Sequence, residues 1–286
     1  MNSCGLALAL ALFAAGPPPA RAPAVPPPAR VASLNLTADE VLAEILPPGR
    51  LVAVTTWADD PAMSNVAGRI PPSVVRLPRA DLERLVALAP DLVVVSEYTD
   101  ADFFRLLERS GLRVHRMSGL DSLAGFRSAI LSLASAVGAD QAAADLVQRY
   151  DALLDDLARR LAGAPRPRVL YWSEPQTAGG GTAIGALIEA AGGINVGREL
   201  GLTGITPVGA ERAFLSDPDV VLVGTWEGAT ESLQRHPLLS RMRAVREGRI
   251  VQMPTPLLVT LSHHAAEACW YLGWALHPDR VPGTRP

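Results

Sequence analysis

Aromatic and acidic side chains follow four segments that the sequence predicts as β-strands. Because ligands bind at the carboxyl ends of strands in open α/β sheets, these side chains are candidates for one binding site. Flat aromatic walls suit a large, partly apolar ligand, and carboxylates would bond its polar rim. Aromatic residues make up only 5% of the chain, so finding several of them at strand ends favours a binding site there. The predicted ligand-binding residues in these loops are Trp57, Asp59, Asp60, Tyr98, Trp172, Trp226 and Glu227.

Each of these side chains also has a structural interpretation. A tryptophan at a strand end also packs between elements, and Asp59 and Asp60 also shape the turn around Pro61. Trp270 and Trp274, four residues apart on the last predicted helix, are interpreted as core.

The chain lacks the short motifs that carry common enzyme chemistry. It has no Gly-x-x-x-x-Gly-Lys phosphate loop and no Gly-x-Ser-x-Gly nucleophile elbow. The glycines at 179–181 precede a predicted helix, whose free N–H groups suit an anion, but no lysine follows them. No His-x-x-x-His pair occurs either. We therefore expect no catalytic residues, no bound metal ion of the protein's own and no enzyme activity.

Two segments, 80–95 and 209–223, repeat one pattern of residues. In each, a glutamate stands seven residues before a Pro-Asp pair, and a β-branched apolar run follows. Glu83 and Glu211 are the glutamates, and the offset of 128 residues is the same for the glutamates and for the prolines. The repeat predicts two similar lobes with a small-molecule site between them, and it places Tyr98 and Trp226 just after the two repeated strands.

The segments around the repeat alternate between strand and helix patterns, which favours parallel α/β sheets. One helix is predicted to start at Thr37 as N-cap, with Glu40 completing a capping box. Residues 140–161 differ from the rest, because apolar residues recur there at three- and four-residue steps without Gly or Pro, which is typical of one long helix. The predicted plan is an N-terminal α/β lobe over 30–138, a connecting helix over 139–163 and a C-terminal α/β lobe over 164–286.

Bulk properties limit the classes of partner. The 286 residues suffice for two lobes of about 100–150 residues each, and a net charge of −3 without a basic stripe argues against nucleic acid. Of the two cysteines, Cys4 falls in the leader and Cys269 in an apolar helical pattern, so no disulfide framework is expected. Residues 1–29 are interpreted as a signal peptide with a Pro-rich spacer, the alternative being an uncleaved or disordered tail.

These features resemble the periplasmic substrate-binding proteins of ABC importers for cobalamin, haem and ferric siderophores. The resemblance rests on the strand at 30–34, Glu83 with Pro90-Asp91, the long helix, and Glu211 with Pro218-Asp219. It implies an α/β fold in which two similar lobes with mainly parallel sheets are joined by a single long rigid helix. It also implies a monomer outside the cytoplasm, whose Glu83 and Glu211 dock onto arginines of a permease dimer that works with ATPase subunits.

The resemblance implies a metal chelate as the transported ligand and no intrinsic cofactor. The aromatic loops contain no Arg or Lys, so a neutral corrinoid of the cobalamin type is the first choice over an anionic ferric siderophore. Haem would need an axial ligand, and His263, His264, Tyr98 and Tyr171 are the candidates, with His263 retained as a binding residue. A surface protein that interacts with partners without transporting a ligand is the alternative from another class.

Overall fold

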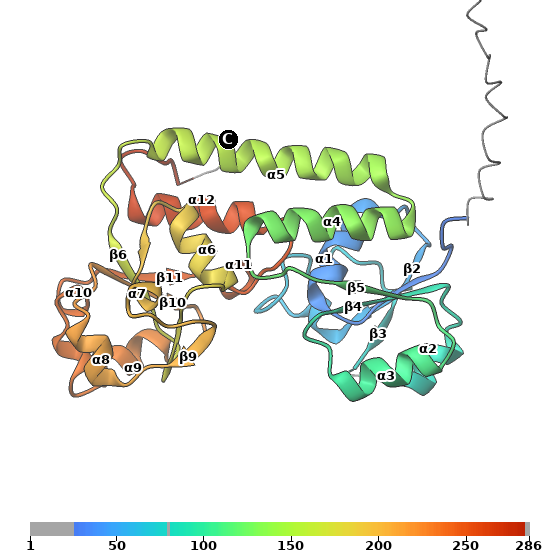
Figure 1. Ribbon diagram of the computed structural model, residues 1–286, viewed down its shortest axis with the longest axis horizontal. Coiled ribbons are helices and arrows are strands. Elements are labelled where there is room, and N and C mark those ends of the chain that lie inside the picture. The colour runs from blue at the N-terminus through green and yellow to red at the C-terminus, as the bar shows by residue number, and fades with distance from the viewer. Residues whose placement is uncertain (1–25, 79–80, 284–286) are drawn as a thin grey trace, which may run out of the picture.

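Two separate parallel sheets organise the chain, one before and one after a long helix (Figure 1). The structure is a computed structural model that describes residues 26–78 and 81–283. The predicted signal segment and Cys4 therefore lie outside the described residues, apart from 26–29 at the end of the spacer. Within the described residues no helix is long and apolar enough to cross a membrane.

The first lobe is built on a five-stranded sheet in the order β3-β2-β1-β4-β5, in which every strand pair is parallel. Its strands at 31–33 and 92–96 are buried along their whole length, and the second is the β-branched run that the sequence predicts as a buried strand. Its strands are β1 (Val31–Ser33), β2 (Leu51–Thr55), β3 (Val75–Leu77), β4 (Leu92–Ser96) and β5 (Val114–Met117). Its helices are α1 (Leu36–Ile45), the 3₁₀ turn η1 (Thr56–Asp59), α2 (Leu82–Ala87), α3 (Ala101–Arg109) and α4 (Leu123–Val137).

The second lobe is built on a four-stranded parallel sheet in the order β11-β10-β6-β8, with a small antiparallel pair beside it. Its strands are β6 (Arg168–Tyr171), β7 (Gln176–Ala178), β8 (Ile194–Asn195), β9 (Ile205–Pro207), β10 (Val220–Gly224) and β11 (Ile250–Met253). Its helices are α6 (Ala183–Ala190), α7 (Val196–Glu199), α8 (Ala210–Leu215), α9 (Ala229–Arg235), η2 (Leu239–Arg241), α10 (Arg243–Arg246), α11 (Thr255–Leu258) and α12 (Ala265–Leu276).

Helix α5 (Asp140–Leu161) spans both lobes, and its ends are those that the sequence predicts (Figure 1). Its predicted apolar stripe is the buried face, which packs on α4 and α12. Gly273 lets α12 approach α5 closely, because a Cβ at that position would lie 2.8 Å from Leu157 Cδ1. The apolar core under α5 contains residues of both lobes, so the helix packs against both lobes as well as connecting them.

The start of α1 differs from the prediction. Its N-cap is Asn35, whose Oδ1 accepts a hydrogen bond from the Ala38 N–H at 2.9 Å. Thr37 therefore lies inside the first turn, and Glu40 does not complete a capping box. The capping-box prediction was wrong because Glu40 is almost completely buried and is bonded elsewhere, to residues distant in sequence.

The repeated segments have one local geometry. Ala89 and Asp217, which precede the two Pro-Asp pairs, are non-glycine residues with φ of 44° and 41°. Asp91 Oδ2 accepts from the Arg30 N–H at the start of β1, and Asp219 Oδ2 accepts from the Arg168 N–H at the start of β6. The aspartates of the Pro-Asp pairs thus tie the starts of neighbouring parallel strands together, β4 to β1 and β10 to β6.

Candidate functional site

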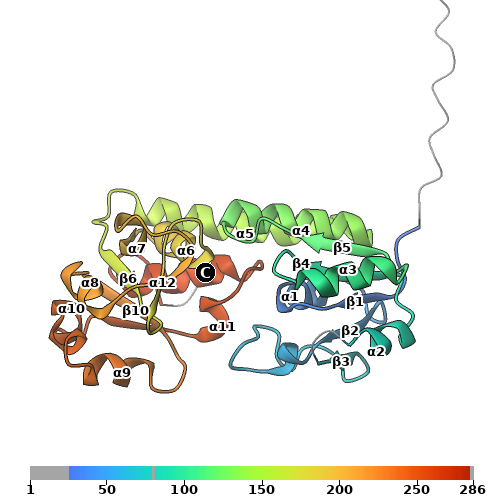
Figure 2. The same cartoon turned by 60° about the horizontal axis from the view of Figure 1, so that its bottom comes forward.

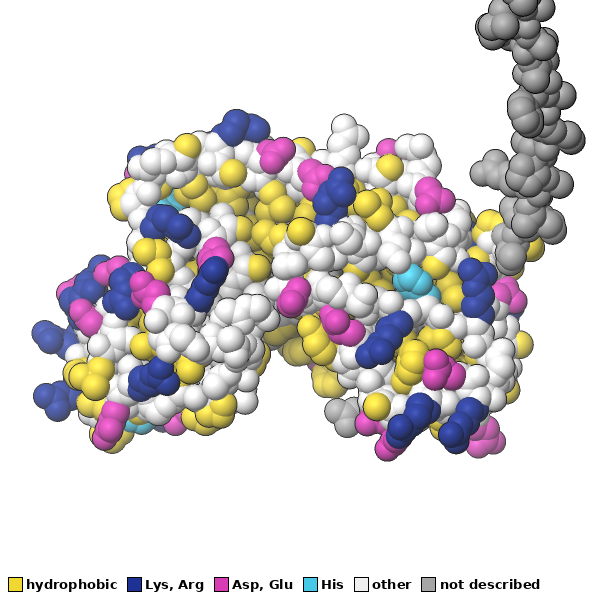
Figure 3. All heavy atoms as spheres, viewed as in Figure 1, with side chains coloured by type: hydrophobic (Ala, Val, Ile, Leu, Met, Phe, Trp, Pro, Cys, Tyr) yellow, Lys and Arg dark blue, Asp and Glu magenta, His cyan; other side chains and the backbone are white. Residues whose placement is uncertain are grey.

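A deep notch separates the two lobes on the side away from α5 (Figure 3). The loop after β2 and the loop after β10 approach this gap from opposite lobes (Figure 2). Both loops follow the carboxyl end of a parallel strand, where open sheets bind ligands.

On the first lobe, Trp57 and Tyr98 leave their aromatic rings in solvent. Trp57 lies in η1 and is 49% exposed, and Tyr98 follows β4 and is 64% exposed. The Tyr98 hydroxyl donates to the Leu120 carbonyl at 3.3 Å, which holds the ring near the start of α4. Tyrosine and tryptophan are enriched at interfaces, so these two exposed side chains are candidates for ligand or partner contacts.

The two acidic residues of the same loop are engaged locally. Asp59 accepts a bidentate ion pair from Arg76, with N–O distances of 2.8 and 2.7 Å, and this guanidinium holds the pKa of Asp59 below its usual value. Asp60 Oδ1 accepts from the Ala62 N–H at 2.9 Å and so shapes the turn at Pro61. Because Arg76 is committed to Asp59, it offers little free positive charge to a ligand.

On the second lobe, Trp172 and Trp226 line a common cavity of about 220 Å³ with Glu174 and Glu227. Trp172 is only 3% exposed, and its Nε1–H is buried without a hydrogen-bond partner among the described residues. Trp226 is 37% exposed, and its ring lies against Gly224, where a Cβ would come within 1.9 Å of it. The cavity is therefore lined by two indole side chains and by two exposed carboxylates.

His263 lies apart from the other predicted ligand contacts. It lines a cavity of about 620 Å³ beneath α5, together with His264, Glu44 and Arg69, and none of the other seven residues lines that cavity. Burial lowers the pKa of His263 to about 3, so its imidazole is neutral at physiological pH. No local sequence pattern indicates this cavity, because its walls come from α1, the loop before β3, α5 and the start of α12.

Glu83 and Glu211 occupy matching positions in the first turns of α2 and α8. Both side chains are exposed, and the two helices lie on the face opposite α5, one in each lobe (Figure 1). Two carboxylates held this way can each meet a cation on one partner surface. Within the described residues no group of three or more His, Cys, Asp or Glu side chains is arranged to hold a metal ion.

Comparison with known proteins gives a family match over most of the chain. The model of a family described as periplasmic binding protein matches residues 31–257. A cobalamin-binding protein of Halobacterium salinarum is 30% identical over 206 residues, which are 69% of this chain and 54% of the relative. The chain thus spans about half the length of the relatives that it matches in this search.

Solved structures share the fold. The periplasmic heme-binding protein RhuT from Roseiflexus sp. RS-1 is 25% identical, with a TM-score of 0.73 over 87% of this chain and 98% of that one. Helicobacter pylori CeuE with Ni(II) bound has a TM-score of 0.76 over 91% of this chain and 87% of that one. At 18% identity, the second likeness concerns the fold alone.

Proposed function

This chain belongs to the periplasmic binding protein family, and on that premise we propose that it captures a cobalamin-like corrinoid between its lobes and delivers it to an ABC importer. The family is one of binding proteins, in keeping with the expectation of a chain without enzyme activity. The proposed place of action is the periplasm or the outer face of the membrane.

The observation that carries the proposal is the set of exposed aromatic rings at strand ends in both lobes. Trp57, Tyr98 and Trp226 leave between a third and two thirds of their surface in water, although burial of aromatic surface is strongly favourable. A macrocycle with flat faces would cover these rings and recover that free energy. The 30% identity to a cobalamin-binding protein supports the same ligand class.

The charges of the second lobe favour a corrinoid over haem. Amide side chains on a corrin rim would donate N–H groups to Glu174 and Glu227. Haem propionates or catecholate oxygens would instead meet two carboxylates and be repelled. Haem is the second candidate because of the likeness to RhuT, which is named as a heme-binding protein.

The test is a titration of the purified protein with cyanocobalamin, haemin and a ferric siderophore, followed by tryptophan fluorescence. We expect quenching by cyanocobalamin at the lowest concentration, and a Kd at least about tenfold higher in Trp226→Ala, because the variant loses an aromatic wall. Trp274→Ala is the matched control, since Trp274 on α12 is 36% exposed against 37% for Trp226, and is not the core residue that the sequence predicts.

Tighter binding of haemin or of the siderophore would replace the corrinoid proposal with that ligand. No response to any of the three would favour the alternative of a surface protein that interacts with partners but transports no ligand. Equal losses in the two tryptophan variants would mean that Trp226 supports the lobe rather than the ligand.

Delivery requires a partner, and we propose that Glu83 and Glu211 dock the binding protein on arginines of a permease dimer. A monomer with an exposed glutamate at the same position of the repeat in each lobe suits a permease whose two subunits are related by a two-fold axis. Arginine is the expected partner because its guanidinium binds a carboxylate through two hydrogen bonds.

A further inference from the structure

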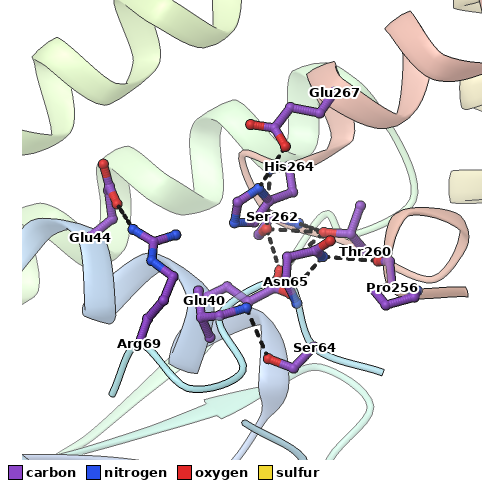
Figure 4. A network of polar contacts seen from close by, with 11 residues as sticks. Glu40, Glu44, Ser64, Asn65, Arg69, Pro256, Thr260, Ser262, His264 and Glu267 are labelled. Atoms are coloured by element: carbon purple, nitrogen blue, oxygen red, sulfur yellow. Dashed lines mark hydrogen bonds and ion pairs between the residues drawn. The ribbon is translucent and has the colours of Figure 1, made fainter. Parts of the chain in front are cut away.

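The side chain of Glu40 lies where the two lobes meet (Figure 4). Its Oε1 accepts from the Asn65 backbone N–H at 3.0 Å and from Asn65 Nδ2 at 2.8 Å. Its Oε2 accepts from the hydroxyls of Thr260 at 3.1 Å and Ser262 at 2.5 Å. Glu40 is only 1% exposed, so four donors replace the water that this carboxylate gave up on burial.

These contacts cross from one lobe to the other. Glu40 belongs to α1 and Asn65 to the loop before β3, both in the first lobe, whereas Thr260 and Ser262 lie between α11 and α12 in the second. Asn65 Nδ2 also donates to the Pro256 carbonyl in α11, at 2.9 Å. Three hydrogen bonds therefore join the lobes around one buried carboxylate.

Open space lies beside this junction. The cavity of about 620 Å³ beneath α5 is lined by Glu44 and Arg69 of the first lobe and by His263 and His264 of the second. The Ser262 hydroxyl, which donates to Glu40, also accepts from the His264 N–H at 3.3 Å, so the network borders the cavity. At the edge of this cavity the polar network joins the two lobes, in addition to the apolar core that they share under α5.

We infer that Glu40 is a positioning residue that fixes the angle between the lobes and so sets the spacing of α2 and α8. Hydrogen bonds to a charged group are stronger than those between neutral groups. Separating the lobes would remove two donors from a buried carboxylate, which is costly because the charge would lose its compensation. Domains of one chain move relative to one another unless their interface prevents it, so this network limits a motion that is otherwise expected. The loop that carries Trp57 continues to Asn65, which connects one wall of the notch to the same network.

The test measures the distance between spin labels on purified protein without ligand, so it does not depend on which ligand is bound. The labels replace Ala87 in α2 and Leu215 in α8, which are exposed and correspond in the repeat, and Cys4 is replaced by Ser. Cys269 is completely buried and stays unlabelled. Electron–electron double resonance then gives the distribution of lobe spacings.

Two variants break the network from opposite sides: Glu40→Ala removes the acceptor, and Thr260→Val with Ser262→Ala removes the donors of the second lobe. We expect each to broaden the distance distribution at least about twofold, because the lobes gain freedom. Asp39→Asn is the control, since Asp39 is the buried neighbour of Glu40 and makes none of these contacts.

An unchanged width in the folded donor variant would overturn the inference, whatever happens to Glu40→Ala. Equal broadening in Asp39→Asn would also overturn it, because the effect would then be a general loss of stability in α1.

Discussion

Asp39 and Glu40 are neighbours in α1 and are both buried, but their carboxyl groups have different hydrogen-bond partners. Glu40 accepts from four donors, whereas Asp39 Oδ2 accepts from Thr55, through its N–H at 3.1 Å and its hydroxyl at 2.5 Å. The Asp39 Oδ1 is buried without a partner among the described residues. Burial therefore raises the pKa of Asp39 to about 7, and a proton on Asp39 relieves the cost of a desolvated charge.

The raised pKa of Asp39 predicts how stability depends on pH. Between its unfolded value of 3.8 and the folded value of about 7, the folded state keeps a proton that the unfolded state releases. The contribution of Asp39 to the free energy of unfolding is thus complete below about pH 4, falls by up to about 1.4 kcal/mol per pH unit, and is lost by about pH 7.

Asp39→Asn should remove this dependence. We expect the stability of the variant relative to the native chain to rise by up to about 4 kcal/mol between about pH 4 and pH 7. Urea unfolding across that range measures the difference. The exposed Asp155→Asn is the control, and a flat difference for both variants would contradict the buried, protonated carboxyl.

At the scale of elements, each copy of the repeat is held by an arginine that donates to two backbone carbonyls, an arrangement that we call the arginine clamp. Arg30 donates to the carbonyls of Leu88 and Ala89, at 2.7 and 3.1 Å. Arg168 donates to those of Ser216 and Asp217, at 2.7 and 2.9 Å. These bonds satisfy carbonyls at the end of α2 and α8 and hold the residue before proline at positive φ, a conformation that is unfavourable for a non-glycine residue.

Arg168→Ala should therefore destabilise the second lobe. Two charge-assisted bonds to helix-end carbonyls are lost, and we expect the free energy of unfolding to fall by about 2 kcal/mol. Arg198→Ala provides the comparison, because its ion pair with Glu189 is exposed and should be worth less than about 1 kcal/mol. Denaturant unfolding measures both, and equal losses would mean that the clamp adds nothing.

At the scale of the whole molecule, both lobes pack against the long helix α5. The apolar core under α5 joins α4, α5 and α12, while the notch on the opposite face stays open (Figure 3). This arrangement holds α2 and α8 on one face of the molecule and leaves Glu83 and Glu211 free to contact a single partner.

The double variant Glu83→Ala with Glu211→Ala tests the docking proposal. We expect ligand affinity to stay within about twofold of the native value, because neither residue lies in a ligand-lining loop, while uptake of labelled cyanocobalamin by cells falls at least about tenfold. Arg84→Ala with Arg212→Ala changes the next residue of each helix and is the control. Normal uptake by the glutamate variant would rule out docking through these residues.

The sequence by itself determined the two-lobe plan, the ends of α5 and the sites of the aromatic loops. These follow from local signals: the period of apolar residues, β-branched runs and a repeat at constant offset. The predicted boundaries at 30–138, 139–163 and 164–286 stay a prediction, although all strands of the first sheet lie in the first range and those of the second sheet in the third.

Only the tertiary structure decided how individual polar and aromatic side chains are used. Glu40 has the spacing of a capping residue, but two of its partners, Thr260 and Ser262, lie more than two hundred residues away. Trp172 packs with its N–H buried while Trp226 keeps its face in water, and His263 faces a cavity under α5 rather than the aromatic loops. Periodicity reports which face of an element is buried, whereas the partner of a buried group is fixed only when distant segments meet.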